Sequence, residues 1–165
     1  MLVIGIDPGT AITGFGLVQA SHDGTELVEY GTITTSAELA LPQRLQILYS
    51  ALTELLRRHR PDQAVVEKLF FSRNTSTAIA VGQGRGVVLL ALANADIPVA
   101  EYTPNEVKQA IVGYGGGRKG QVQEMVRILL RMNAIPTPDD AADALALAIC
   151  HAHGENMRRL LDQAR

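Results

Sequence analysis

The sequence of 165 residues has one cysteine, Cys150, which excludes a disulfide framework and a zinc cluster built on several thiolates. It shows no secretory leader, no internal repeat and no low-complexity tract. A continuous membrane-length apolar run is also missing, because the longest apolar stretch, Ala78 to Ala95, carries Gln83, Arg85 and three glycines near its middle. We therefore expect a reduced, cytoplasmic protein with no membrane partner.

An excess of charge of one sign is lacking as well. The net charge of −2 neither indicates nor excludes binding to nucleic acid, since the local arrangement of charge matters more than the sum. Apolar residues make up 47% of the chain and charged residues 19%, which is the composition of a folded domain and not of a disordered chain.

Three consecutive segments have the pattern of β-strands. An apolar run, Leu2 to Asp7, is followed by a Pro-Gly turn, and two alternating segments lie on either side of the turn signal at residues 22–24. These two alternating segments are Thr13 to Gln19 and Glu26 to Thr34. Short links between the three segments predict an antiparallel meander.

The pattern then changes to helices that alternate with short strands. Helices are expected over residues 45–60, 74–94, 104–112, 121–132 and 138–153, and strands over residues 64–67 and 97–102. Crossover connections of this kind normally join parallel strands. We predict an α/β fold with a mixed five-stranded sheet, made of the meander plus two parallel strands, and helices on both faces. Residues 1–153 form a single domain in this prediction, and residues 154–165 form a polar C-terminal tail.

Acidic residues follow two of the apolar strands, Asp7 after the first and Glu67 after the fourth. The carboxyl edge of an open α/β sheet is where ligands bind. Asp7 also fits a simple turn role before Pro8, whereas Glu67 lies among large apolar residues, where a turn role does not explain it. Both acids are therefore candidates for a site.

A third acidic segment begins a helix. Asp140 and Asp143 are three residues apart and so share one helix face. Asp139 and Asp140 can be explained by the helix dipole, but Asp143 lies deeper in a run of alanines and leucines. Carboxylates from these three segments would repel one another unless a divalent cation lay between them. Oxygen ligands favour Mg²⁺ or Mn²⁺, and two such ions can support phosphodiester hydrolysis.

Five motifs together resemble the RuvC family of crossover (Holliday) junction endodeoxyribonucleases, within the RNase H-like superfamily. The motifs stand in the family's order between Met1 and about His153: GIDPGT at residues 5–10, VVEKLFF at 65–71, VKQAIVG at 107–113, RKGQVQ at 118–123 and DAADALA at 140–146. Each motif is weak alone, and the set of five is specific. The resemblance implies an RNase H-like fold.

The resemblance also implies a set of site residues. The four metal-binding catalytic carboxylates are matched by Asp7, Glu67, Asp140 and Asp143. Lysines near the cut phosphate are matched by Lys108 and Lys119, and a base-stacking aromatic by Phe70. Asp139 departs from the family pattern, which leaves open whether it contributes to the metal site, although spacing favours Asp140. Arg73 and Arg118 are further candidates for phosphate contact.

Most of these DNA-binding candidates have a structural alternative. Lys108 could be a solvent-facing lysine of a helix, Arg73 an ordinary surface arginine, and Phe70 or Phe71 a core residue. Arg118 and Lys119 end a glycine-rich loop at a helix start, where backbone amides favour phosphate binding.

The resemblance further implies the activity and its partners. A homodimer with Mg²⁺, with Mn²⁺ as a substitute and two ions in each site, would nick two opposed strands of a four-way junction and leave 5′-phosphate and 3′-hydroxyl ends. The RuvA–RuvB branch-migration complex would be a partner, and no nucleotide cofactor is expected.

Other classes share parts of this pattern. Actin-like ATPases and sugar kinases also open with a G-I-D-x-G-T turn, but their fold needs a second such domain and would leave the acids at positions 67, 140 and 143 without a task. Another RNase H-like nuclease has the same acids, and only the motifs around Phe70, Lys108 and Lys119 favour a junction enzyme. A junction-binding protein without catalysis is disfavoured because all four acids are present.

Overall fold

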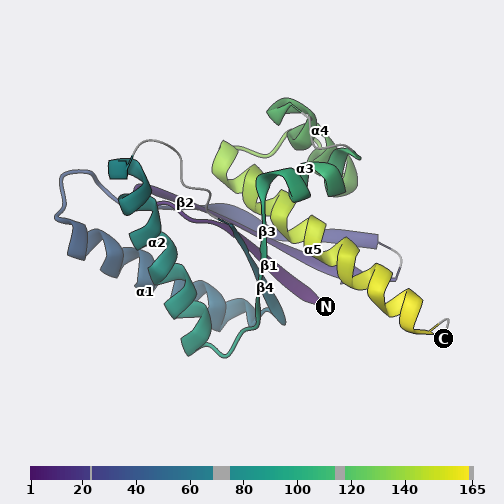
Figure 1. The fold of residues 1–165 in the computed structure, drawn as a ribbon, viewed down its shortest axis with the longest axis horizontal. Helices are drawn as coiled ribbons and strands as arrows, with labels where there is room; N and C mark the ends of the chain where they lie inside the picture. Colours follow the sequence, from purple (N-terminus) through teal and green to yellow (C-terminus); the bar gives the residue numbers. More distant parts are fainter. Residues whose placement is uncertain (23, 69–74, 114–117, 164–165) are drawn as a thin grey trace.

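The computed structural model describes residues 1–22, 24–68, 75–113 and 118–163. Within these ranges the elements follow one another as shown in Figure 1: β1 (Leu2–Asp7), β2 (Ile12–Ser21), β3 (Gly24–Thr34), α1 (Leu41–His59), β4 (Gln63–Glu67), α2 (Thr75–Asn94), β5 (Val99–Tyr102), α3 (Pro104–Val112), α4 (Lys119–Leu129) and α5 (Asp139–Gln163).

One five-stranded sheet in the order β3-β2-β1-β4-β5 forms the centre of the molecule. β1 pairs with β2, and β2 with β3, in antiparallel register. β4 pairs in parallel with β1 on one side and with β5 on the other. The predicted meander with two added parallel strands is confirmed.

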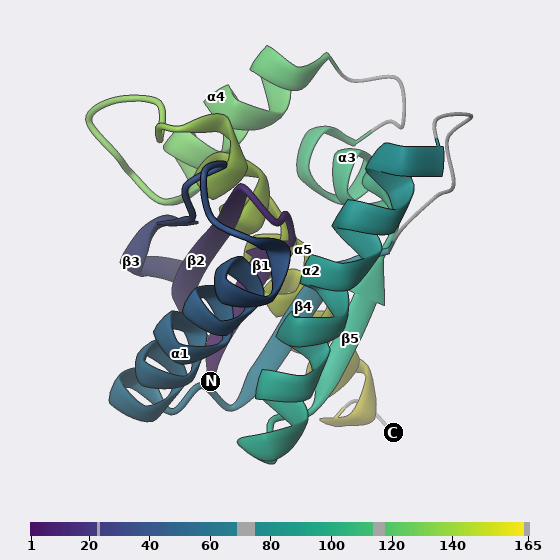
Figure 2. The same ribbon diagram turned by 90° about the vertical axis from the view of Figure 1, so that its left-hand side faces the viewer.

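Helices cover both faces of this sheet (Figures 1 and 2). Successive residues of a strand point to opposite faces, so Ile4 and Val66 pack with α1 and α2 while Val3 and Val65 pack with α4 and α5. The apolar stripe of α1 consists of Leu48, Leu52, Leu55 and Leu56, all of them buried. The prediction of helices on both faces is confirmed.

Glycines in β1 and β2 allow α5 to lie directly on the sheet. A Cβ atom at Gly5 would be 2.0 Å from the carbonyl oxygen of Ala144, and one at Gly14 would be 2.0 Å from that of Asp140. Real Cβ contacts are never this short, so any side chain at these two positions would push the helix away. The N-terminal end of α5 is therefore held against the carboxyl end of β1.

Several helix boundaries follow from local signals. α1 ends where Arg60 adopts a left-handed conformation just before Pro61. α3 begins with a capping box: the Glu106 N–H donates to Thr103 Oγ1 at 3.2 Å, and the Thr103 N–H donates to Glu106 Oε2 at 2.7 Å. This box fixes the start of the helix that carries Lys108.

The last helix extends beyond its expected end. α5 continues to Gln163, whereas the sequence pattern predicted a helix that stops at about His153 and a tail after it. The prediction rested on the polar composition after His153, although Met157, Leu160 and Leu161 keep the helical spacing of three and four residues. Among the described residues, no helix is both long enough and apolar enough to span a membrane.

Candidate functional site

Two neighbouring strand ends carry the first pair of acids. Asp7 is the last residue of β1 and Glu67 the last of β4. These strands run in parallel, and the residues just before the acids, Ile6 and Val66, are register partners. The two carboxylates therefore lie side by side at the carboxyl edge of the sheet.

α5 brings the second pair of acids to the same edge. Gly14 of β2 is the register partner of Asp7, and its missing side chain leaves room for the Asp140 backbone. Asp143 lies one turn further along α5, and its side chain lines the same pocket as Glu67. The structure thus brings all four predicted carboxylates to one end of the sheet.

The electrostatics of the site show the crowding of negative charge. The pKa of Asp7 is raised from 3.8 to about 7, first by burial and then by the negative charges of Glu67, Asp143 and Asp140. The pKa of Glu67 is also raised, mainly by burial and secondly by the charge of Asp143. The pKa of Asp143 is raised mainly by burial, and the hydrogen bond from Lys119 works against this. The carboxylates are costly to ionise together without a cation nearby.

Lys119, at the first position of α4, supplies positive charge beside the acids. Its Nζ lies 3.2 Å from Asp143 Oδ2 and 3.1 Å from Asp139 Oδ2. Asp139 is 64% exposed and also accepts a hydrogen bond from Gln123 Nε2 at 2.9 Å. Its hydrogen bonds from Lys119 and Gln123 lower its pKa. Asp139 is therefore an ion-pair partner of Lys119, whereas the charge of Asp140 raises the pKa of Asp7.

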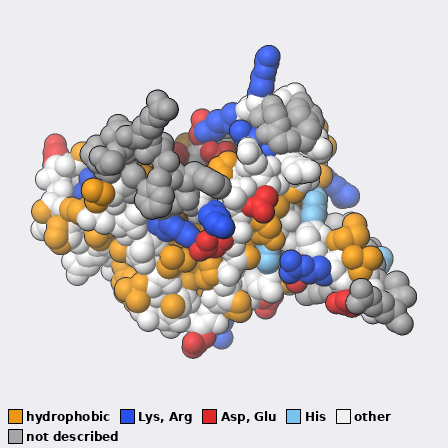
Figure 3. All heavy atoms as spheres, viewed as in Figure 1, with side chains coloured by type: hydrophobic (Ala, Val, Ile, Leu, Met, Phe, Trp, Pro, Cys, Tyr) orange, Lys and Arg blue, Asp and Glu red, His pale blue; other side chains and the backbone are white. Residues whose placement is uncertain are grey.

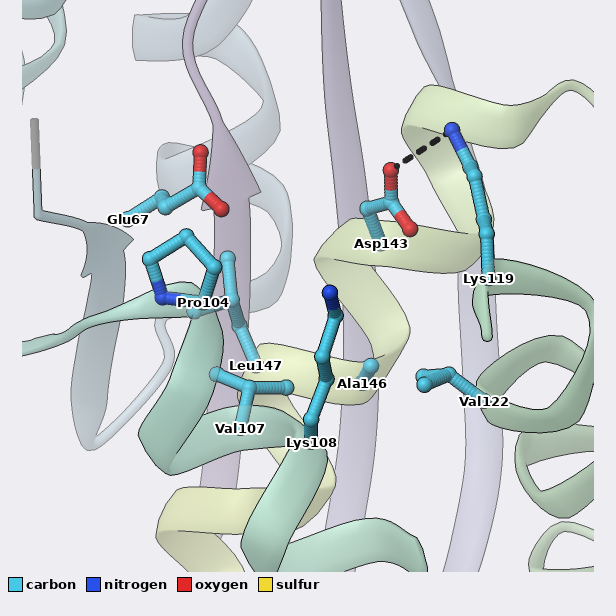
Figure 4. A pocket seen from close by; sticks show the side chains of 9 residues that line it. All are labelled: Glu67, Pro104, Val107, Lys108, Lys119, Val122, Asp143, Ala146 and Leu147. Carbon is cyan, nitrogen blue, oxygen red and sulfur yellow. Dashed lines mark ion pairs between the residues drawn. The ribbon is translucent and has the colours of Figure 1, made fainter. Parts of the chain in front are cut away.

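A pocket of about 170 Å³ lies between β4, α3, α4 and α5 (Figure 4). The carboxylates of Glu67 and Asp143 stand on the same side of this pocket, and Lys108 rises toward them from α3. The remaining walls are apolar and consist of Pro104, Val107, Val122, Ala146 and Leu147. The pocket is much larger than the space that one water molecule needs, so it has room for a small ligand.

The other predicted DNA-binding residues are placed as follows. Arg118 is the exposed N-cap residue of α4, beside Lys119 but outside the pocket, and its N–H donates to Gln121 Oε1 at 2.8 Å. Phe70 and Arg73 lie outside the described residues.

The donor set suits a hard divalent cation, because it consists of carboxylate oxygens with raised pKa values that a cation would lower. Among the residues that the structure describes, no group of three or more His, Cys, Asp or Glu is already arranged to hold a metal ion. A bound ion would therefore have to draw the carboxylates together. The residues present fit the implied metal.

Several features of the site were not predicted from the sequence. The glycine contacts of β1 and β2 with α5, the pairing of Lys119 with Asp139 and the apolar pocket walls are tertiary features. Leu147 offered one signal, since it follows Asp143 at a helical spacing of four and so shares its face.

Comparison with known proteins gives consistent matches along the chain. The family model for the crossover junction endodeoxyribonuclease RuvC matches residues 3–151. RuvC of Roseiflexus sp. is 54% identical over 162 residues, which cover 98% of this chain and 96% of that protein. RuvC of Chloroflexus aurantiacus is 56% identical over 153 residues, covering 93% of each chain.

Solved structures agree with these matches. The structure of T. thermophilus RuvC in complex with Holliday junction substrate has a TM-score of 0.90 and 37% identity, covering 95% of this chain and 96% of that one. The yeast mitochondrial Holliday junction resolvase Ydc2 has a TM-score of 0.65 at 14% identity, covering 99% and 86% of the two chains, and shares the fold alone. The fold is RNase H-like, as the resemblance predicted, and the chain belongs to the RuvC family of crossover junction endodeoxyribonucleases.

Proposed function

We propose that this chain resolves four-way (Holliday) DNA junctions in recombination and repair, by hydrolysing one phosphodiester bond in each of two opposed strands. The products would carry 5′-phosphate and 3′-hydroxyl ends. The observation that carries the proposal is the convergence of Asp7, Glu67 and Asp143, all with raised pKa values, beside the two lysines of the pocket. The similarity to RuvC in complex with Holliday junction substrate supports the choice of DNA substrate.

Asp7, Glu67, Asp140 and Asp143 would hold the divalent cations, two in each site, with Mg²⁺ as the natural ion and Mn²⁺ as a substitute. Bound there, the cations would help to activate a water and to stabilise the leaving 3′-oxygen. Asp140 is preferred over Asp139 as a ligand because its charge acts on Asp7, whereas Asp139 is exposed and bound to Lys119.

The lysines have separate tasks in this proposal. Lys108 and Lys119 line the pocket and lower the pKa of Glu67, so both ammonium groups lie within electrostatic reach of the site. They would bind the phosphate of the cut strand and offset its charge. Arg118 would contact a neighbouring phosphate from the N-terminal end of α4. Phe70 and Arg73 remain proposed DNA contacts, for base stacking and phosphate binding.

We also propose a homodimer that contacts through α2. Ile79 is 63% exposed and Leu90 is 54% exposed, and both lie on one face of the helix with Gly82 and Gly86, where added Cβ atoms would meet nothing. Figure 3 shows hydrophobic side chains gathered over the part of the molecule where Figure 1 places α2. A two-fold dimer matches the two-fold symmetry of an open junction, so each subunit would cut one strand.

A cytoplasmic location with chromosomal DNA follows from this function, as does cooperation with the RuvA–RuvB branch-migration complex.

The dimer is tested by the mass in solution of the wild type and of Leu90→Glu, which places a charge on the exposed face of α2. A dimeric wild type and a monomeric variant support the α2 contact, whereas a monomeric wild type excludes it.

The activity is tested with one synthetic four-way junction and a linear duplex of the same sequence, each with Mg²⁺ and with EDTA, on a denaturing gel. We expect paired, symmetric nicks in the junction alone, and no nicks in EDTA or with Asp7→Asn. Equal cleavage of the duplex would point to an unselective nuclease. Cleavage that persists in EDTA would overturn the role of the metal.

A further inference from the structure

His151 is a buried titratable side chain that the proposed chemistry leaves unused. It lies on α5 and is 5% exposed. Among the described residues, Thr13 is the other polar side chain that is buried. Its neighbours on the helix, Ile149, Cys150 and Ala152, are apolar and buried. A polar ring in such surroundings is costly unless its two nitrogens are bonded.

Both ring nitrogens of His151 have partners on the sheet. Nε2 lies 2.5 Å from Oε1 of Gln63, the first residue of β4, and Nδ1 lies 3.1 Å from the hydroxyl of Tyr102, the last residue of β5. Burial lowers the pKa of His151, which keeps the ring neutral near pH 7. In a neutral ring, Nε2–H donates to Gln63 while Nδ1 accepts from the Tyr102 O–H, so each group is satisfied.

The spacing along the two elements links these bonds to the candidate active site. On α5, Asp143 and His151 are eight residues apart and on the same face, a distance of about 12 Å at 1.5 Å per residue. On β4, Gln63 and Glu67 are four residues apart on the same face, a distance of about 13 Å at 3.3 Å per residue. The nearly equal lengths mean that a bond between His151 and Gln63 at one end sets Asp143 opposite Glu67 at the other.

Tyr102 makes the same connection from the next strand. It is the register partner of Glu67, and its carbonyl accepts a hydrogen bond from the N–H of Lys68 at 2.8 Å. The hydroxyl of Tyr102 then joins this strand end to His151 on α5. The backbone that carries Glu67 and the helix that carries Asp143 are thus tied to one imidazole.

We propose that His151 is a positioning residue, whose hydrogen bonds to Gln63 and Tyr102 set the position of α5 along the sheet and thereby the separation of Asp143 from Glu67. Most of the remaining α5 contact is apolar, with Leu145 and Ile149 packed on the sheet and Ala144 lying on Gly5, and such packing fixes the position of the helix less sharply than hydrogen bonds do. Asn156, near the end of α5, adds a hydrogen bond to the Ser21 carbonyl at 3.2 Å, at the far end of the helix from Asp143. The metal has to draw the carboxylates together, so a small shift of α5 would change how well they hold it. This inference rests on the function proposed above.

The test compares His151→Leu with His153→Leu, a matched control two residues along the same helix with an exposed side chain. Single-turnover cleavage of a pre-bound junction is measured against Mg²⁺ concentration, with junction Kd measured in Ca²⁺. We expect His151→Leu to cleave about 10–100-fold more slowly or to need correspondingly more Mg²⁺, with Kd within about twofold of wild type. His151→Gln, which keeps an N–H for Gln63, should recover part of the rate.

Tyr102→Phe removes only the hydroxyl and serves if His151→Leu does not fold. We expect a smaller effect in the same direction from this variant. A lower melting temperature with unchanged rate and Mg²⁺ dependence in the folded variants would show a role in stability alone and overturn the proposal, as would a loss confined to Kd. A wild type that fails to cleave would instead overturn the proposed function, so the two failures are distinguishable.

Discussion

Replacing Asp7 by Asn should make the metal-free protein more stable at pH 8. The pKa of Asp7 is raised from 3.8 to about 7, mainly by burial, so the folded state holds this proton more tightly than the unfolded state. The stability that results is fully present below pH 3.8 and is lost as the pH rises through 7. At 1.36 kcal/mol per pKa unit, the loss is about 4 kcal/mol as an upper limit. Asn resembles the protonated acid and escapes this loss.

The assay is urea unfolding of both proteins in EDTA between pH 4 and pH 8. We expect the variant's advantage to grow from under about 1 kcal/mol at pH 4 to a few kcal/mol at pH 8. Added Mg²⁺ should then stabilise the wild type more than the variant, because the ion binds the ionised carboxylates of the folded state. An advantage that does not change with pH, or a variant less stable than wild type at pH 8, would refute this account of the site.

Three further predictions concern packing, capping and DNA binding. Gly14→Ala should lower the free energy of unfolding by about 3 kcal/mol or more and slow cleavage, because its Cβ would collide with the Asp140 carbonyl. The control is Gly120→Ala in α4, which has open space around it and should leave the free energy of unfolding in urea nearly unchanged or slightly higher. Thr103→Ala should cost about 1 kcal/mol in the same measurement, through loss of the α3 cap. Junction Kd should weaken steeply with salt, and a flat titration would argue against a phosphate-dominated interface.

The sequence predicted the arrangement of the sheet because its signals are local. Alternation identified β2 and β3, and the apolar run before Asp7 identified β1. The same reasoning predicted that acids at two parallel strand ends share one edge. The acids at positions 67, 140 and 143 disfavoured the ATPases that share the glycine turn, and the motif resemblance favoured a junction nuclease. Membership of the RuvC family agrees with that choice.

The features that the sequence did not reveal depend on contacts between distant residues. No local pattern shows that Gly14 has to be small for Asp140, or that Lys119 binds Asp139 as well as Asp143. The partners of His151, Gln63 and Tyr102, lie on strands far away in the sequence, so no pattern within the helix indicates them. The end of α5 was interpreted as a tail because most of its residues are polar, although Met157, Leu160 and Leu161 keep the helical spacing.

The central claim is that the four carboxylates hold divalent cations at the edge of the sheet. It is tested most directly by anomalous diffraction from crystals soaked in Mn²⁺, for the wild type and for Asp143→Asn. The account predicts manganese peaks bounded by Asp7, Glu67 and the N-terminal turns of α5 in the wild type, weakened or lost in the variant. Manganese bound only elsewhere, or bound equally in both proteins, would contradict it.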